Sequence, residues 1–233
     1  MNIYYLASLQ EETQSGTPRY LWEKANKETI IKKCWLSLQE SISEEDRIFL
    51  IDSNLPIKIL KWFIDTATGL ITYVKVQNTN NKYEYLLTAL EQLEQNISDR
   101  SHFIVEDDHL FVYDGLNVIR NCLQHWYGFG VPNDNPNKYT TPFESHVYIG
   151  NDRHWRTIQN ASWCIYANSQ VWKGYINLIK ENSKTNNYDI FKTSILQQTP
   201  GICPMPGVST HLKEGNMTPL IDWTNRWKEI SIK

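Results

Sequence analysis

Strand-like and helix-like segments alternate along the first half of the chain, and this order constrains the fold more than any other feature of the sequence. Segments rich in apolar or β-branched residues, which are typical of strands, lie at 3–9, 48–51, 70–76 and 102–105. Segments with apolar residues at helical spacing lie between them, at 21–42, after Pro56 and around 86–93. The alternation predicts an α/β fold in which helices flank a mostly parallel central sheet.

The second half has a different pattern. It predicts helices at 116–126 and 171–179, and strands at 147–149 and 162–167 that flank a turn at 150–152. The tail from Pro200 to Trp223 carries four Pro and three Gly, which predicts mostly loop. We therefore expect a small antiparallel part in this half, within a single domain that covers residues 1–233.

Charge and composition exclude several classes of protein. The chain has 23 Lys and Arg against 26 Asp and Glu, a net charge of −3, and its basic residues are scattered, so a nucleic-acid partner is not expected. No stretch approaches the ~20 apolar residues of a transmembrane segment. The first residues, Met1–Tyr5, lack the features of a signal peptide. These observations predict a cytoplasmic protein in which the four widely spaced cysteines are reduced.

An acidic run follows the fourth predicted strand directly: Glu106, Asp107 and Asp108. Three adjacent carboxylates repel one another, and the end of a buried strand is a costly place for them. A divalent cation would resolve this conflict, and hard oxygen ligands suit magnesium or manganese, which also bind substrate phosphates. A solvated acidic turn is the simpler alternative.

The segment Val105–His109 resembles the acidic metal motif of the GT-A fold glycosyltransferases. Two further segments strengthen the resemblance, Asp152–Thr157 and Pro206–His211, the second followed by Thr218–Trp223. Together they resemble a compact bacterial or phage group of these enzymes. The resemblance implies a GT-A-like (Rossmann-like) fold, with a nucleotide-sugar-binding half at about 1–113 and an acceptor-side half at about 114–233. It implies transfer of a sugar, from a donor that is most often UDP-linked, to a hydroxyl of an unidentified glycan or small-molecule acceptor.

Carried over residue by residue, the resemblance makes Asp108 the direct metal ligand. Glu106 and Asp107 would contact the ribose or reach the metal through water. His211 matches the C-terminal histidine that many of these enzymes add to the metal site. Because imidazole nitrogen is a softer ligand than oxygen, it favours Mn²⁺ over Mg²⁺.

Other positions are candidates for contacts with the nucleotide. Asp52 resembles the carboxylate that accepts from the base or ribose, although the family usually has a pair of Asp here and Ser53 follows in this chain. Asp is also favoured as a simple turn former at a strand end. Ser8 and Arg19 lie at or after the first strand, where family members often contact the nucleotide.

The segment around Asp152 has its own candidates. Arg156 could bind the diphosphate, since its guanidinium matches phosphate oxygens, and Trp155 could stack on the acceptor sugar. The alternative is a polar hairpin with one buried Trp. An inverting enzyme also needs a carboxylate that takes the acceptor proton, and Asp152 is the first candidate, with Glu144 the second.

Two other classes of function remain open. A nucleotidyltransferase or pyrophosphatase would use the same metal and diphosphate chemistry, but it should have a Gly-rich phosphate loop after the first strand. Residues 10–20 contain a single Gly. A non-catalytic module that binds sugar nucleotides would bind the donor without turnover.

Overall fold

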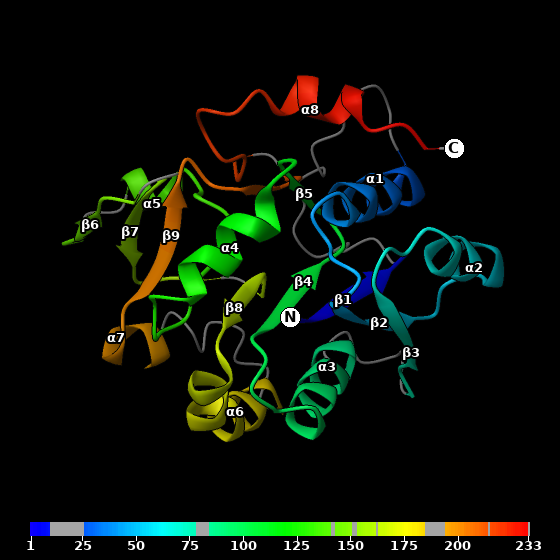
Figure 1. The fold of residues 1–233 in the computed structure, drawn as a ribbon, viewed down its shortest axis with the longest axis horizontal. Coiled ribbons are helices and arrows are strands. Elements are labelled where there is room, and N and C mark those ends of the chain that lie inside the picture. Colours follow the sequence, from blue (N-terminus) through cyan, green and yellow to red (C-terminus); the bar gives the residue numbers. More distant parts are fainter. Residues whose placement is uncertain are drawn as a thin grey trace.

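A five-stranded sheet forms the centre of the molecule. The computed structural model describes residues 1–9, 26–77, 84–140, 143–150, 153–161, 163–184, 194–213 and 215–232. The strands of the sheet, in spatial order, are β3 (Leu70–Lys75), β2 (Arg47–Ser53), β1 (Asn2–Ser8), β4 (His102–Glu106) and β8 (Ile165–Ala167). The first four are parallel and β8 runs antiparallel to β4. The predicted α/β class with a mostly parallel sheet is confirmed (Figure 1).

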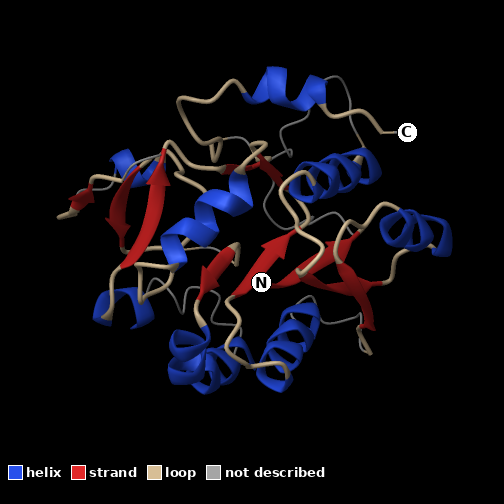
Figure 2. Cartoon of the chain, in the orientation of Figure 1, coloured by secondary structure: helices blue, strands red, loops and turns tan. Residues whose placement is uncertain are grey.

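Helices cover both faces of this sheet (Figure 2). One face carries α1 (Lys27–Gln39), α2 (Ile57–Asp65) and α4 (Gly115–Leu123). The other carries α3 (Glu84–Gln95) and α6 (Ser169–Lys184). Strand β1 alternates between the two layers, because successive side chains of a strand point to opposite faces. Tyr4 and Leu6 accordingly pack with α3 and α6, whereas Ile3 and Tyr5 pack with α1 and α2.

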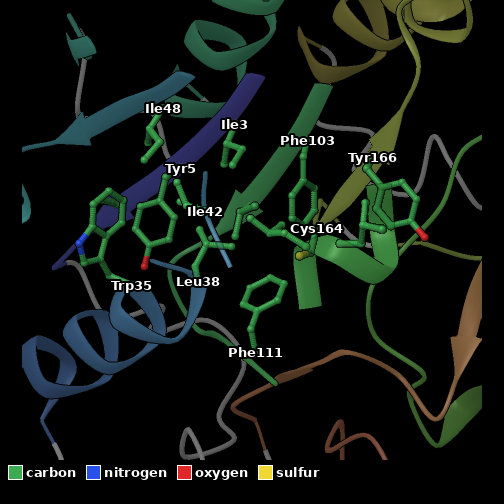
Figure 3. Close-up of a cluster of buried hydrophobic side chains, with 14 of the residues drawn as sticks. Ile3, Tyr5, Trp35, Leu38, Ile42, Ile48, Phe103, Phe111, Cys164 and Tyr166 are labelled. Carbon is green, nitrogen blue, oxygen red and sulfur yellow. The ribbon is translucent and has the colours of Figure 1, made fainter. Parts of the chain in front are cut away.

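Large aromatic side chains fill the core under α1 and α2, and Figure 3 shows Tyr5 and Trp35 among them. The ring centroids of Tyr5 and Trp35 lie 5.0 Å apart at an interplanar angle of 72°, and those of Trp35 and Phe63 lie 5.0 Å apart at 79°. Such edge-to-face pairs contribute about 0.5–1.5 kcal/mol beyond their burial. All three rings are fully buried, so this cluster fixes both helices on the sheet.

Several helices differ in length from their predicted bounds, among them α6, which is longer at both ends than the predicted 171–179. Helix α1 begins at Lys27, where the side chain of Asn26 caps it by accepting a hydrogen bond from the Thr29 amide at 2.8 Å. Residues 21–25 of the predicted helix lie outside the described part of the chain. Helix α4 ends at Leu123, three residues before the predicted end, and its last turn closes at Gln124.

The second half forms more strand than the sequence predicted. Strands β6 (Val147–Tyr148), β7 (His154–Ile158) and β9 (Gly201–Met205) make a three-stranded antiparallel sheet, and β10 (Ser209–His211) pairs with β5 (His109–Phe111). The second half also contains three short helices, α5 (Asn137–Thr140), α7 (Leu196–Gln198) and α8 (Trp223–Glu229). No helix of the described chain has the length and apolar character needed to cross a bilayer.

The structure adds detail to one prediction about this half and contradicts another. The tail from Pro200 to Trp223 is mostly loop, as predicted, but it also contains the short strands β9 and β10. Proline is compatible with β9 because β9 is an edge strand of its sheet and the backbone nitrogen of Pro204 points away from β7. No hydrogen bond between β7 and β9 is therefore lost at this position. The partner of β6 is β7 rather than a strand at 162–167, and β8 belongs to the central sheet instead.

Gly130 connects the two sheets. Its amide and carbonyl both bond to the backbone of Tyr166 in β8 at 2.8 Å, and its neighbours Phe129 and Val131 bond to Ile202 in β9 at 3.0 and 2.9 Å. A Cβ atom on Gly130 would lie 2.3 Å from Cε2 of the buried Tyr166 ring. The absence of a side chain here therefore allows the backbone to pass directly over that ring.

We expect Gly130→Ala to lower the free energy of unfolding by about 1–3 kcal/mol, the usual cost of overpacking a core. Gly174→Ala is the matched control, because no atom lies within 4 Å of its added Cβ and it lies within α6. Alanine there should stabilise the helix by about 0.5–1 kcal/mol. Urea unfolding of both variants measures the difference. Equal stability of Gly130→Ala and the native chain would contradict this account.

Candidate functional site

The carboxyl ends of β1 and β4 define one edge of the central sheet. Strand β1 has β2 on one side and β4 on the other, so the chain order reverses between β1 and β4. Ligands of open parallel sheets bind outside the carboxyl ends of the strands at such a reversal. Ser8 ends β1 and Glu106 ends β4, and the turn that follows carries Asp107 and Asp108. The acidic run therefore lies where this fold places its ligands.

Asp107 points into the protein. It is buried, and its Oδ1 lies 2.5 Å from Nζ of Lys27 while its Oδ2 accepts a hydrogen bond from the Ser8 amide at 2.7 Å. Burial raises the pKa of Asp107, and the positive charge of Lys27 opposes that shift. Asp107 thus connects the end of β1, the first turn of α1 and the end of β4. Its predicted contact with the nucleotide, and that of Ser8, stay predictions.

Asp108 lies between two imidazoles. Its Oδ1 is 3.2 Å from Nδ1 of His109, and its Oδ2 is 3.2 Å from Nε2 of His211. The two histidines face each other across the β5–β10 pair, with ring centroids 5.0 Å apart and an interplanar angle of 12°. Burial alone would raise the pKa of Asp108, but the charge of His211 and hydrogen bonds from both histidines hold it well below its ordinary value.

The structure therefore brings Asp108 and His211 together, although 103 residues separate them in sequence. Their roles as metal ligands stay predictions. Sequence reasoning gave no role to His109, whose ring is fully buried, contacts Asp108 and stacks on the ring of His211. Burial lowers the pKa of His109, which keeps the ring neutral and able to bind a metal.

The donor atoms of this cluster fit a divalent cation. Ligand atoms of Glu106, Asp108 and His109 all lie within 4.8 Å of one another. Two ligands that each lie ~2.0–2.2 Å from an ion are about 3 Å apart when they are neighbours in its coordination shell. The 3.2 Å between Oδ2 of Asp108 and Nε2 of His211 matches that spacing. Nε2 of His109 is buried and has no hydrogen-bond partner among the described residues, an arrangement that is costly without a ligand.

Asp52 has protein partners for both carboxylate oxygens. Oδ1 accepts from the Leu55 amide at 2.6 Å, and Oδ2 accepts from the Tyr73 hydroxyl at 2.9 Å. These bonds close the turn after β2, where Asn54 adopts a φ of 70°. The arrangement is that of a strand-end turn, the alternative open at the sequence level. A contact between Asp52 and the nucleoside stays a prediction.

Arg156 lies in β7 and is buried. Its guanidinium forms an ion pair with the fully buried carboxylate of Asp134, lies 4.0 Å from the centroid of the Tyr139 ring and donates to the carbonyl of Lys138 at 3.1 Å. The structure thus gives this predicted diphosphate ligand a carboxylate partner inside the protein. Its role toward a diphosphate stays a prediction.

Two residues near this ion pair were missed at the sequence level. Asp134 stands in an Asn-Asp-Asn run that is typical of a turn, and Lys138 carries no sequence signal. Burial lowers the pKa of Lys138, whose ammonium donates to the Asn133 carbonyl at 3.2 Å. The charge of Lys138 also helps to lower the pKa of His109, so the two clusters interact electrostatically.

None of the remaining candidate residues from the sequence is placed at the metal-ligand cluster by the described part of the structure. Arg19 and Asp152 lie outside the described residues. Glu144 is exposed and precedes Ser145, whose hydroxyl donates to the Thr157 carbonyl of β7 at 2.9 Å. Trp155 is half-buried in β7 and lines a cavity that contains none of the metal-ligand candidates.

Lys27 was also missed, and it did carry a signal. It is the first residue of α1, where a positive charge is unfavourable to the helix dipole. A cation at such a position indicates a partner elsewhere in the fold, here Asp107.

Comparison with known proteins gives the fold but no family. No family model matches the sequence, and no curated protein matches it. A protein assigned as a glucose-1-phosphate thymidylyltransferase from Bacillus anthracis aligns with 100% of this chain and 96% of its own, with a TM-score of 0.51 and 13% identity. At that identity the similarity concerns the fold alone.

Weaker similarities involve two other solved structures. Residues 1–349 of TarS from S. aureus match with a TM-score of 0.43 and 12% identity over 74% of this chain, which spans 48% of the TarS fragment. A protein assigned as a nucleotide-diphospho-sugar transferase from Desulfovibrio desulfuricans matches with a TM-score of 0.48 and 10% identity, over 84% of this chain and 74% of its own.

We expect Lys27→Met to lower the free energy of unfolding by about 3–5 kcal/mol, because it leaves the buried charge of Asp107 without its partner. Lys180→Met is the matched control. It removes an exposed pair with Glu94 at 2.6 Å and should cost about 0–1 kcal/mol. Adding Asp107→Asn to Lys27→Met should recover part of the loss. Chemical unfolding measures the free energy of unfolding of each variant. If Lys27→Met lowers it no more than Lys180→Met does, the Lys27–Asp107 pair does not stabilise the fold as argued.

Proposed function

We propose that this chain is a metal-dependent transferase that moves a sugar from a nucleotide sugar, most often UDP-linked, to a hydroxyl of an acceptor. The observation that carries the proposal is the cluster of Glu106, Asp108, His109 and His211 at the carboxyl end of β4. It lies beside the reversal of strand order, where parallel sheets bind nucleotides.

Asp108 and His211 would hold the ion, with His109 and Glu106 as further ligands. A metal bound there would neutralise the charge that develops on the diphosphate as the sugar departs. Mixed carboxylate and imidazole ligands favour Mn²⁺ over Mg²⁺. The chain keeps the ligands in place through the backbone, since the Leu212 amide donates to the carbonyl of Asp108 at 2.9 Å.

One side chain and one backbone amide would shape the site without binding the ion. Lys27 neutralises Asp107, which leaves Asp108 as the carboxylate of the turn that faces the histidines. The Ser8 amide, bonded to Asp107, fixes the end of β1 next to that turn.

Asp152 is the first candidate for the base of an inverting reaction, and the exposed Glu144 is the second.

Nucleotidyl transfer is the second candidate. The similarity in fold to the Bacillus anthracis protein, over nearly the whole length of both chains, favours it. The single Gly in residues 10–20 favours glycosyl transfer instead, because nucleotidyl transfer is expected to use a Gly-rich phosphate loop. The two reactions release different products, nucleoside diphosphate in the first case and pyrophosphate in the second.

We expect the full chain to release nucleoside diphosphate from at least one member of a panel of sugar nucleotides when Mn²⁺ is present. Asp108→Ala should abolish the release, and His211→Ala should weaken Mn²⁺ binding at least about tenfold and shift the preference towards Mg²⁺. Electron paramagnetic resonance of free Mn²⁺ measures binding without turnover.

Asp99→Ala is the matched control, since this carboxylate precedes β4 at the opposite edge of the sheet. It should leave binding and release unchanged. Unaltered Mn²⁺ binding in Asp108→Ala, or full release in excess chelator, would refute the metal site. Pyrophosphate formed from nucleoside triphosphate and sugar 1-phosphate, with no diphosphate released, would assign the second candidate.

A further inference from the structure

A cavity of about 670 Å³ opens between the C-terminal half of α4 and the β6–β7 hairpin. Figure 1 places α4 beside β7 and β9, and Ile202 of β9 forms part of the lining. Its volume falls within the ~300–1,000 Å³ of small-molecule sites. None of Glu106, Asp108, His109 and His211 lines it, so it is separate from the candidate metal site.

Three aromatic side chains form much of the cavity wall: Trp126, Tyr148 and Trp155. The ring centroids of Trp126 and Tyr148 lie 5.9 Å apart at 58°, so their faces are not stacked flat against each other. Nε1 of Trp126 donates to the Phe129 carbonyl at 3.0 Å, which fixes that ring. Tyr148 is 46% exposed, so part of its ring is accessible from solvent.

Polar side chains lie among these rings. Asn121, Gln124 and His125 extend from the last turns of α4 and the residues that follow it. They can donate to and accept from hydroxyl groups. A purely apolar ligand would remove them from water without replacing their hydrogen bonds, at a cost in affinity.

The cavity has little uncompensated charge. Among the described residues that line it, none is Asp, Glu or Lys. Arg153 is the one guanidinium in that lining, and it is already engaged. Its Nη1 donates to the Pro206 carbonyl at 3.0 Å and its Nη2 lies 3.7 Å from Asp114. A phosphorylated or carboxylate ligand would therefore find no free partner charge in this lining.

We propose that this cavity binds a neutral saccharide of one or two rings. Such a ligand presents apolar C–H faces, which pack on aromatic rings, and hydroxyl groups around its rim, which pair with the amide and imidazole groups. The mixed lining and the compensated charge both match that chemistry. The proposal does not depend on the transfer reaction, because sugar binding here requires neither donor nor metal.

Saturation-transfer NMR and calorimetry test this on the full chain without metal or nucleotide. The probes are glucose, galactose, N-acetylglucosamine and maltose, with UDP as a charged comparison. We expect saturable binding of at least one sugar, with a dissociation constant on the order of 1 mM. Tyr148→Ala and Gln124→Ala should each weaken it by roughly fivefold or more, since each removes one contact.

Tyr127→Ala is the matched control. This side chain is 75% exposed, precedes β6 in the same half of the chain and does not line the cavity, so its loss should leave sugar affinity unchanged. Circular dichroism confirms that each variant folds. Equal affinity of Tyr148→Ala and the native chain would overturn the proposal. It would also be overturned if none of the sugar probes showed saturable binding. Displacement of the sugar by UDP would also overturn it, because the cavity would then be a nucleotide site.

Discussion

Asp107 and Asp108 are adjacent carboxylates buried in one turn, and each depends on a cationic or hydrogen-bonding partner from a distant part of the chain. Two buried carboxylates side by side repel each other, and burial penalises both charges. Lys27, 80 residues away, compensates the first, and His211, 103 residues away, compensates the second. The turn after β4 therefore joins the start of α1 and the C-terminal strand β10 to the edge of the central sheet.

The C-terminal helix α8 also contacts α1 and β5 directly. Helix α8 lies beside α1 in Figure 1, and Nζ of Lys33 donates to the Trp227 carbonyl at 2.6 Å. Arg226 forms an ion pair with Glu40 at the end of α1 and donates to the Phe111 carbonyl of β5 at 2.8 Å. His211 is thus held by the pairing of its own strand, β10, with β5, and the chain that follows it is held by α8. This explains how a Pro- and Gly-rich tail positions a histidine against Asp108.

Local patterns in the sequence were enough to predict the four parallel strands of the central sheet and the position of the acidic run, but not the place of β8 in that sheet. The apolar segments at 48–51 and 102–105 have one interpretation as short buried strands, and the carboxylates after the second must lie at the sheet edge. Strands β9 and β10 could not be predicted in this way, because their partners β7 and β5 are distant in sequence and their proline content resembles that of a loop. The partners of Asp134 and Arg156 were hidden for the same reason, since no local pattern relates a turn residue to a strand residue of the other sheet.

The distribution of charge around this edge bears on what could bind there. Among the described residues, Lys27 is committed to Asp107 and Arg156 to Asp134. Lys138 is buried, and burial lowers its pKa, which weakens it as a permanent countercharge. A nucleoside diphosphate at this edge would bring further negative charge next to Asp108, whose own charge is already stabilised by two histidines. Lys27, Arg156 and Lys138 therefore supply little free positive charge for such a ligand, and a divalent cation held by Asp108 and His211 would supply it.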